Sequence, residues 1–290
     1  QAASVREALL LELRRQRVKI ELGCGIRQIL PKKGSYEICT KNGNFYAKTC
    51  ILATGGKAAK HTGSDGSGFL YLEPLSHHVI DLVPALTGLQ AKPPFPKSLA
   101  GIRAEAEVKL FVENAQIASD FGEVQMTAEG ISGIPVFQVS RYGIRALKQG
   151  KNVTLILNFL PEFSREQLKA FLKIRKENCP YKGKKDFLTG LFPDKLAKVL
   201  LSANDLEEAI SSYPLKVTGY QSFEQAQVCS GGVDTTQVNA RTLESTRNSG
   251  LYFAGELLDI DGKCGGYNLQ WAWSSGYVAG VNASKMSERV

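Results

Sequence analysis

The residues with the clearest capacity for chemistry lie near the end of the chain, between residues 250 and 276. Glu256 follows a short apolar strand, and Gly265 and Gly266 open a helix. The first N–H groups of a helix have no partner within the helix, and glycine lets a ligand approach them closely. A strand end, a glycine loop and a helix start in this order therefore predict a site for an anionic or electron-rich ligand.

Other reactive side chains are weaker candidates for this chemistry. Arg141 could bind an anionic substrate, although its segment could equally be a tight connection between strands. Cys264 adjoins the glycine loop, but a single cysteine without a resolving partner is more typical of a bystander. The six cysteines form no C-x-x-C pair and the chain has three histidines, so we expect no metal site. No catalytic acid or base is evident.

The elements that position these residues are strands and helices on both sides of them. Residues 49–54 read as a continuous apolar strand, which is expected where a sheet is buried on both faces, and Gly55 and Gly56 follow it. Upstream, apolar patterns predict strands over 18–22 and 25–29 and a hairpin over 36–47 with an Asn-Gly turn. A short helix is expected over 69–75.

The middle of the chain changes its pattern twice. Alternating segments at 104–112, 123–127 and 152–158 predict a small antiparallel sheet or barrel. Residues 164–213 then show helical spacing, and Ser164 with Gln167 matches a capping box. Lys182, Lys184 and Lys185 form a basic run; a solvated face is its default reading, and a nucleic-acid contact is the alternative.

The simplest architecture that fits these patterns is an α/β nucleotide-binding domain interrupted by an insertion. Its expected parts are a first domain segment (1–83), an inserted β domain (84–162), a helical subdomain (163–214), return strands of the insert (215–230) and a second domain segment (231–290).

Composition and charge limit the classes of protein to which the chain can belong. With 290 residues, 43% of them hydrophobic, the chain is typical of a globular protein of two or three subdomains. No apolar run approaches the ~20 residues of a membrane helix. Unpaired, scattered cysteines suit a reducing cytoplasm, so we expect a cytoplasmic protein. The net charge of +8 is compatible with an acidic partner such as RNA, and equally with solvated lysines and arginines.

Six short motifs, in order along nearly the whole chain, resemble those of one known family. That family is the YhiN/BaiN-type flavoproteins, NAD(P)/FAD-dependent oxidoreductases related to the glutathione-reductase-like FAD fold. Single glycine motifs are weak signals, but their shared order and spacing are specific. The motifs are ILATGG (51–56), GISG (130–133), AQVCSGGV (226–233), GLYFAGE (250–256), DIDG (259–262) and GGYNLQ (265–270).

The resemblance implies a fold, a cofactor and a set of binding residues. The fold would be a discontinuous FAD-binding Rossmann-like domain with an inserted small antiparallel β-barrel and a helical subdomain. The cofactor would be FAD, with NAD(P)H as reductant and hydride transfer through flavin N5 to an unknown small-molecule substrate. The residues implied to contact FAD are Ile26, Ala53, Thr54, Gly55, Gly56, Gly255, Glu256, Gly265, Gly266, Tyr267 and Asn268.

One departure from the family affects this expectation. The family opens with a strand, a Gly-x-Gly-x-x-Gly turn and a helix that hold the FAD pyrophosphate, and this sequence contains no such turn. The chain begins at Gln1 and reads as a helix from Val5 onwards, so we expect an upstream segment. Two alternatives therefore accompany the oxidoreductase reading. The chain could be an RNA-directed flavoenzyme that reduces a uridine-type ring, or an incomplete, inactive fragment inclined to self-associate.

Overall fold

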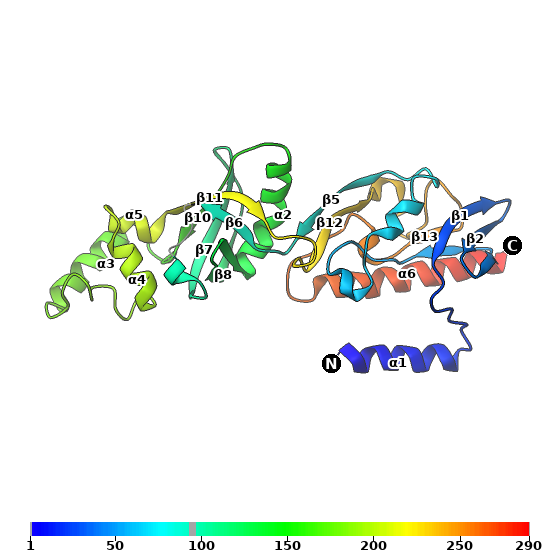
Figure 1. The fold of residues 1–290 in the computed structure, drawn as a ribbon, viewed down its shortest axis with the longest axis horizontal. Coiled ribbons are helices and arrows are strands. Elements are labelled where there is room, and N and C mark those ends of the chain that lie inside the picture. The colour runs from blue at the N-terminus through cyan, green and yellow to red at the C-terminus, as the bar shows by residue number, and fades with distance from the viewer. Residues whose placement is uncertain (1, 93–96, 290) are drawn as a thin grey trace.

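The computed structural model describes residues 2–92 and 97–289, and these form an elongated molecule of two lobes (Figure 1). The terminal lobe is built from both ends of the chain and contains β1 to β5, β12, β13 and α6. The inserted lobe contains β6 to β11 and helices α2 to α5. The predicted α/β fold with an inserted barrel and helices is therefore confirmed, whereas the exact domain boundaries stay a prediction.

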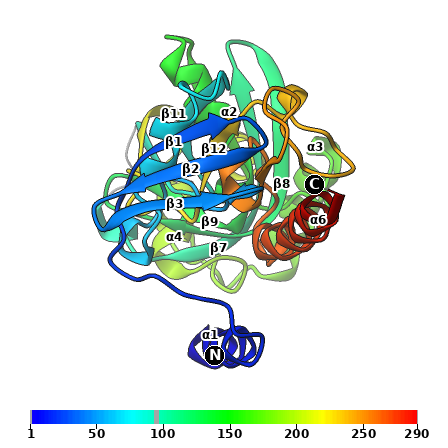
Figure 2. The same cartoon turned by 90° about the vertical axis from the view of Figure 1, so that its right-hand side faces the viewer.

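The terminal lobe combines an antiparallel sheet with two pairs of strands. The sheet has the order β1-β2-β3, and its hairpin turn lies where the Asn-Gly signal predicts it. β4 and β13 run parallel, with Phe253 opposite Leu52, and β5 and β12 run antiparallel, with Val228 opposite Ala85. α6 lies beside this sheet (Figure 2). The bounds are β1 (Ile26–Lys32), β2 (Ser35–Thr40), β3 (Gly43–Ala47), β4 (Cys50–Leu52), β5 (Val79–Ala85), β12 (Val228–Val233), β13 (Leu251–Phe253) and α6 (Tyr267–Arg289).

The inserted lobe is a closed barrel with the strand order β10-β11-β6-β9-β8-β7. All neighbouring strands are antiparallel, and alternate residues point inward, as Ala106, Val108 and Leu110 of β7 show by their complete burial. Closure leaves the barrel without a free strand edge. The strands are β6 (Leu89–Lys92), β7 (Arg103–Val112), β8 (Ala115–Met126), β9 (Gly130–Gly133), β10 (Val153–Asn158) and β11 (Tyr213–Tyr220).

Three helices extend the inserted lobe between β10 and β11. They are α3 (Arg165–Asn178), α4 (Asp194–Leu201) and α5 (Leu206–Ser211). The predicted capping box is present, because Ser164 Oγ accepts from Gln167 N and the Gln167 side chain accepts from Ser164 N. Buried leucines of α3 and α4 join the hydrophobic core of the barrel, so the helices and the barrel fold as one packed unit.

A helix that the sequence analysis did not predict lies against the barrel. α2 (Ile134–Lys148) occupies the segment expected to be an interruption or a connection. Its buried residues include Val136, Val139 and Ile144, at helical spacing. Pro135 in the first turn is a known helix-start signal that could have indicated it.

The start of the chain forms the expected helix but not the expected strand. α1 (Ala2–Arg15) has no buried residue, and Figure 1 shows it apart from the rest of the lobe. The predicted strand over 18–22 is wrong, because this extended segment pairs with no strand among the described residues, and Val18, Ile20 and Leu22 are exposed. A strand pattern produces a strand only where a partner strand is present.

Two further expectations need correction. The strand at 49–54 is not buried on both faces, because Ile51 is 41% exposed, and β4 pairs with β13 alone among the described residues. The helix expected over 69–75 is a single 3₁₀ turn, Ser67–Tyr71. Across residues 2–92 and 97–289, none of the helices combines the length and apolar character needed to cross a bilayer.

Candidate functional site

The parallel strands β4 and β13 bring two glycine-containing segments to one edge of the terminal lobe. Residues 53–56 continue from β4, and Ala254, Gly255 and Glu256 continue from β13. Because parallel strands end on the same side, these segments meet beyond the carboxyl ends, where open α/β sheets bind ligands. The structure thus packs Gly56 against Glu256, and Ala53, Thr54 and Gly55 lie between β4 and this contact. The binding of a cofactor by these residues stays a prediction.

Glu256 is held by a residue from a different strand. Its Oε1 accepts a hydrogen bond from the backbone N of Cys229 at 2.7 Å, and the Cys229 thiol lies 3.6 Å from the same oxygen. Burial raises the pKa of Glu256 above the usual carboxyl value. Burial, followed by the nearby Glu256 charge, raises the pKa of Cys229 to about 12, so its thiol is protonated at neutral pH.

Glu256 faces a hollow of about 310 Å³ together with the start of α6. Of the predicted cofactor-binding residues, Glu256, Gly265, Gly266 and Asn268 line this hollow. Its volume is at the lower limit of small-molecule sites. The complete lining is Gln227, Val228, Glu256, Cys264, Gly265, Gly266, Asn268, Leu269 and Ala272.

Gly265 and Gly266 leave open space at the start of α6. Their φ angles are +105° and +103°, which side-chain-bearing residues rarely adopt, and a Cβ atom on either would meet nothing within 4 Å. The first N–H groups of α6 follow directly. The glycines therefore shape the backbone and keep the approach to the helix start free.

Asn268 holds the loop before the helix rather than facing only the hollow. Its Oδ1 accepts from Gly262 N at 2.8 Å, and its Nδ2 donates to Gly262 O at 3.2 Å. Both backbone groups of one residue are thus bound by one amide side chain. Tyr267, in contrast, is exposed and does not line the hollow.

Two residues of α6 that the sequence analysis missed fix the position of Gly255. Trp271 Nε1 donates to Gly255 O at 3.1 Å, and Ser275 Oγ accepts from Gly255 N at 2.9 Å. Ser275 is buried and lies four residues after Trp271, on the same helix face. A serine and a tryptophan at i and i+4 look like ordinary packing positions in sequence, so only the fold reveals this contact.

The glycines after β4 are required by close packing. A Cβ atom on Gly56 would overlap the Cys229 sulfur and lie 2.9 Å from Glu256 Cδ. A Cβ atom on Gly55, whose φ is +73°, would overlap the Ser64 hydroxyl. The segment after β4 therefore packs directly on the carboxylate that ends β13.

Helix α2 of the inserted lobe holds the loop that precedes the glycines. Arg141 Nη1 forms an ion pair with Asp261 Oδ2 and also donates to Asp261 O at 2.7 Å. One turn further, Arg145 donates to Ser230 Oγ at 2.8 Å and lies 3.8 Å from Asp259. Arg141 thus contacts the loop before Gly265 rather than open solvent, and its predicted role in substrate binding stays a prediction.

Ile26 lies away from the hollow, at the start of β1. Its carbonyl oxygen accepts a hydrogen bond from the Tyr71 hydroxyl at 2.9 Å, and its side chain packs on the core of the terminal lobe. The structure therefore brings Ile26 together with the 3₁₀ turn at 67–71 and not with Glu256. A contact of its backbone with adenine is a prediction that needs an extended ligand.

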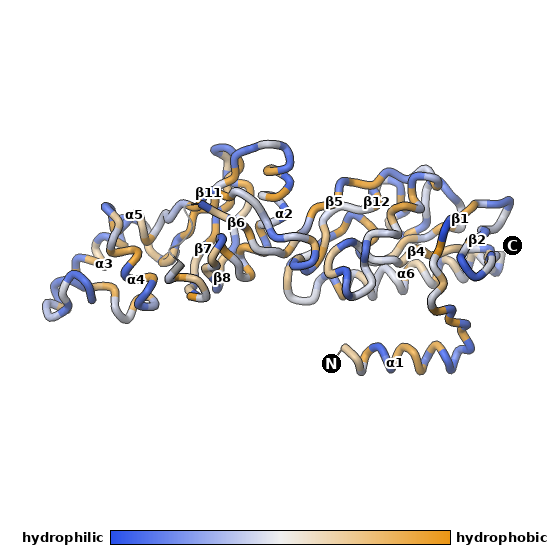
Figure 3. Tube along the Cα trace, viewed as in Figure 1, coloured by the Kyte–Doolittle hydropathy of each residue, from blue (hydrophilic) through white to orange (hydrophobic). Residues whose placement is uncertain are grey.

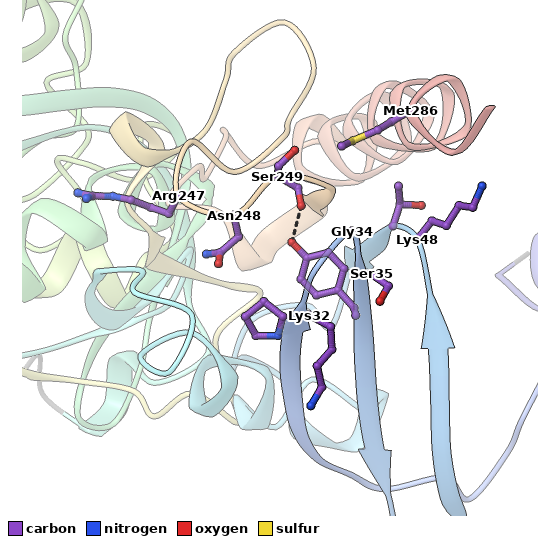
Figure 4. A pocket seen from close by; sticks show the side chains of 11 residues that line it. Lys32, Gly34, Ser35, Lys48, Arg247, Asn248, Ser249 and Met286 are labelled. Atoms are coloured by element: carbon purple, nitrogen blue, oxygen red, sulfur yellow. Dashed lines mark hydrogen bonds between the residues drawn. The ribbon is translucent and has the colours of Figure 1, made fainter. Parts of the chain in front are cut away.

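A second hollow, of about 300 Å³, lies between the β1–β2 hairpin and the end of α6 (Figure 4). Tyr36 OH donates to Ser249 O across it at 2.7 Å. Its cations do not converge: Lys32 pairs with Glu37 at 2.9 Å, and Lys48 donates to Ser287 O at 3.3 Å. The hollow beside Glu256 is the stronger candidate, because it lies beyond the carboxyl ends of the parallel strands β4 and β13 and at the start of α6.

Comparisons with known proteins show the family of this chain. The family model of the HI0933-like protein Rossmann domain matches residues 1–282. A 3-dehydro-bile acid delta(4,6)-reductase of Clostridium scindens is 42% identical over 98% of this chain and 74% of the reductase. Ribosomal RNA dihydrouridine synthases of Haemophilus influenzae and Escherichia coli are 29% and 28% identical; the matches cover 83% and 79% of this chain, but 61% and 58% of the synthases.

Proposed function

Because the chain belongs to the HI0933-like family of flavoprotein oxidoreductases with a Rossmann domain, we propose that it is an FAD-dependent oxidoreductase acting on a small molecule. The observation that carries this proposal is the hollow beside Glu256, at the carboxyl ends of the parallel strands and the start of α6. Bound FAD would supply the redox chemistry by carrying a hydride at N5, and NAD(P)H is the proposed reductant.

The residues that line the hollow fit the flavin end of FAD. The free approach at Gly265 and Gly266 suits the pyrimidine edge of the ring, where the reduced cofactor carries negative charge. A charge at a helix start is stabilised by about 0.3–1 kcal/mol when exposed and up to ~2 kcal/mol when partly buried. Glu256 Oε1 accepts from Cys229 N, and Oε2 is the oxygen assigned here to a ribityl hydroxyl.

The remaining predicted contacts follow the direction of an extended cofactor. Ala53, Thr54, Gly55 and Gly56 would lie along the dinucleotide, and the backbone of Ile26 would face the adenine. No residue of the sequence replaces the Gly-x-Gly-x-x-Gly turn that binds the pyrophosphate in related folds. The described residues thus account for the flavin end and not for the phosphates.

The test places upstream of this chain a strand, a Gly-x-Gly-x-x-Gly turn and a helix of the kind that binds the pyrophosphate in related folds. We expect the fusion protein to be yellow after purification and its flavin to be bleached anaerobically by NADH or NADPH. The 290-residue chain by itself should bind FAD weakly. A fusion protein that folds but shows no flavin absorption would contradict the proposal.

A matched variant tests the role of Glu256 in the same fusion protein. Glu256→Ala removes a charged hydrogen-bond acceptor, which is worth about 1.5–3 kcal/mol, or roughly 10- to 150-fold in FAD affinity. Glu244→Ala is the control, because it removes an equal negative charge from a residue outside the hollow. Equal FAD affinity of wild type and Glu256→Ala in a titration would remove Glu256 from the site.

The similarity to two RNA-modifying synthases favours a second candidate, reduction of a uridine-type ring in RNA. The basic net charge of +8 is compatible with it. Because phosphate contacts release counterions, RNA binding should weaken steeply with salt. An RNA titration at 50 and 200 mM salt tests this candidate. A cytoplasmic location, which the unpaired cysteines favour, would suit either substrate.

A further inference from the structure

A further hollow lies in the helical part of the inserted lobe, distant from the hollow beside Glu256. We propose that the hollow between the end of α3, the loop that follows it and the α4–α5 connection binds an amphipathic organic anion, with an apolar body and one carboxylate or sulfonate. Its volume is about 510 Å³, well within the range of small-molecule sites. Its lining is Lys176, Lys182, Lys184, Phe187, Leu201, Ala203, Asn204 and Leu206.

The polar part of the lining is cationic. Residues 169–185 contain seven basic residues and one acidic residue, Glu177, so most of the chain's net charge of +8 gathers here. Across the parts of the chain that the structure describes, neither Lys176 nor Lys184 has a carboxylate within 4.0 Å. Figure 3 shows the loop after α3 as a hydrophilic segment at the end of the molecule. An anion would therefore be attracted and would meet free ammonium groups.

The apolar part of the lining is held in place by the backbone around it. Phe187, Leu201 and Leu206 are half-buried, each with part of its surface facing the hollow. Arg175 Nε donates to Phe187 O at 2.9 Å, and Lys182 Nζ donates to Thr189 O at 2.9 Å. The first bond ties the loop to α3 and the second joins two parts of the loop, so the hollow is shaped before any ligand arrives.

The combination of cations and apolar side chains selects the class of ligand. A nucleic acid offers phosphates along an extended backbone and stacks its bases on exposed aromatic side chains, whereas Tyr181, the exposed aromatic residue of this loop, does not line the hollow. Here a compact hollow places Leu201 and Leu206 beside Lys176 and Lys184, which matches a ligand with an apolar body and a single charged end. Burial of the body would supply most of the binding free energy, and the lysines would orient the charged group.

The neighbouring acidic residue does not cancel this charge. Asp205 adjoins Leu206, but its Oδ1 caps α5 by accepting from Glu208 N at 3.0 Å, and its Oδ2 lies 3.8 Å from Arg165. Both carboxylate oxygens therefore have partners other than Lys176 and Lys184. The proposal concerns binding alone and does not depend on the proposed redox function.

The test uses the complete 290-residue chain and two probes of stated chemistry. Binding of 8-anilino-1-naphthalenesulfonate is followed by its fluorescence, and laurate is added as a non-fluorescent competitor. The double variant Lys176→Glu/Lys184→Glu should bind both about tenfold more weakly or worse, because two attractive charges become repulsive. Lys176→Arg/Lys184→Arg should retain binding.

A charge-matched control lies on the same helix outside the hollow. Lys169→Glu/Lys173→Glu changes the net charge equally, and its affinity for both probes should stay within about twofold of wild type. Equal weakening in both double variants would overturn the proposal, as would a wild-type chain that does not bind laurate. Displacement of the sulfonate by a short single-stranded RNA, but not by laurate, would overturn it in favour of a nucleic-acid surface.

Discussion

At the scale of single residues, the site depends on contacts between segments that are distant in sequence. Glu256 was predicted from its place at the end of a strand, yet its partner, the backbone of Cys229, lies 27 residues earlier. The carboxylate is also more deeply packed than its sequence position suggests, since Gly56 and Cys229 both lie against it. Its ionisation is therefore coupled to the stability of the fold.

Glu256→Gln should stabilise the chain at high pH. Burial raises the pKa of Glu256, so the folded state favours the protonated form. Its contribution to stability is present below the unfolded-state pKa and is lost as the pH rises through the raised folded-state pKa. Urea unfolding should show the variant to be more stable than wild type at pH 8, with the difference vanishing towards pH 4. Glu73→Gln, at an exposed position, controls for the lost charge, and a difference independent of pH would contradict the prediction.

Two glycine-to-alanine substitutions should have opposite effects on stability. Gly56→Ala would force a Cβ atom into Cys229 and Glu256 and should cost about 1–3 kcal/mol. Gly276→Ala adds a methyl group in α6 where nothing lies within 4 Å, and it should stabilise the helix by about 0.5–1 kcal/mol. Thermal unfolding of both variants checks the pair, and a neutral Gly56→Ala would mean that the segment after β4 is not tightly packed.

At the scale of elements, α2 and α6 hold the chain segments that precede and follow Glu256 in sequence. α6 binds both backbone groups of Gly255 through Trp271 and Ser275, and α2 holds Asp261 through Arg141. Helix α2 belongs to the inserted lobe, so a movement of that lobe would be transmitted to the loop before Gly265. The glycines provide the space, and the two helices determine where that space lies.

Breaking the Arg141–Asp261 pair should cost far more stability than breaking a surface pair. The side chains are 17% and 10% exposed, and removing one partner of a buried pair costs about 3–5 kcal/mol because the other charge is left uncompensated. Arg141→Met should show this loss in urea unfolding. The control is Arg103→Met, which breaks a pair whose side chains are 58% and 56% exposed and should cost under about 1 kcal/mol. Similar losses in both variants would show that α2 does not hold the loop.

Much of the element pattern was predictable from the sequence, and the failures have physical reasons. The barrel strands and the capping box of α3 were predicted because alternation and local side-chain bonds are encoded nearby. The strand over 18–22 failed because pairing depends on a partner that no local pattern reveals. Helix α2 was missed because its glycine and serine residues obscure the apolar face, although Pro135 marks its start. The hydrogen bonds that hold Gly255 and the ion pair that holds Asp261 join segments that are distant in sequence. They could not be predicted from one sequence.

At the scale of the whole molecule, the terminal lobe exposes apolar surface that the inserted lobe does not cover. Leu269, Trp273 and Tyr277 are exposed at four-residue intervals on α6, and β4 has one strand partner among the described residues. Unpaired strand edges and apolar helix faces promote association between chains. The chain should therefore be less prone to aggregation when a further segment or a second copy covers this surface.

The 290-residue chain should self-associate in a concentration-dependent way. Light scattering after size-exclusion chromatography should give a mass above that of the monomer at micromolar concentration, and Trp273→Glu should reduce it by placing a charge in the apolar face of α6. Tyr181→Glu, at an exposed aromatic residue of the inserted lobe, is the control. A monomer at all concentrations would contradict the prediction.

The pairing of Ala85 with Val228 has an evolutionary consequence. It brings together the points at which the chain leaves and re-enters the terminal lobe, so the barrel and its helices are connected to that lobe at one place. Replacement of the whole inserted lobe would leave β4, β13 and α6 unchanged, provided that the new lobe kept the contacts of Arg141 and Arg145 with the terminal lobe. The outer surface of the inserted lobe can therefore change in evolution while the hollow beside Glu256 is kept, because the two are encoded in different segments of the sequence.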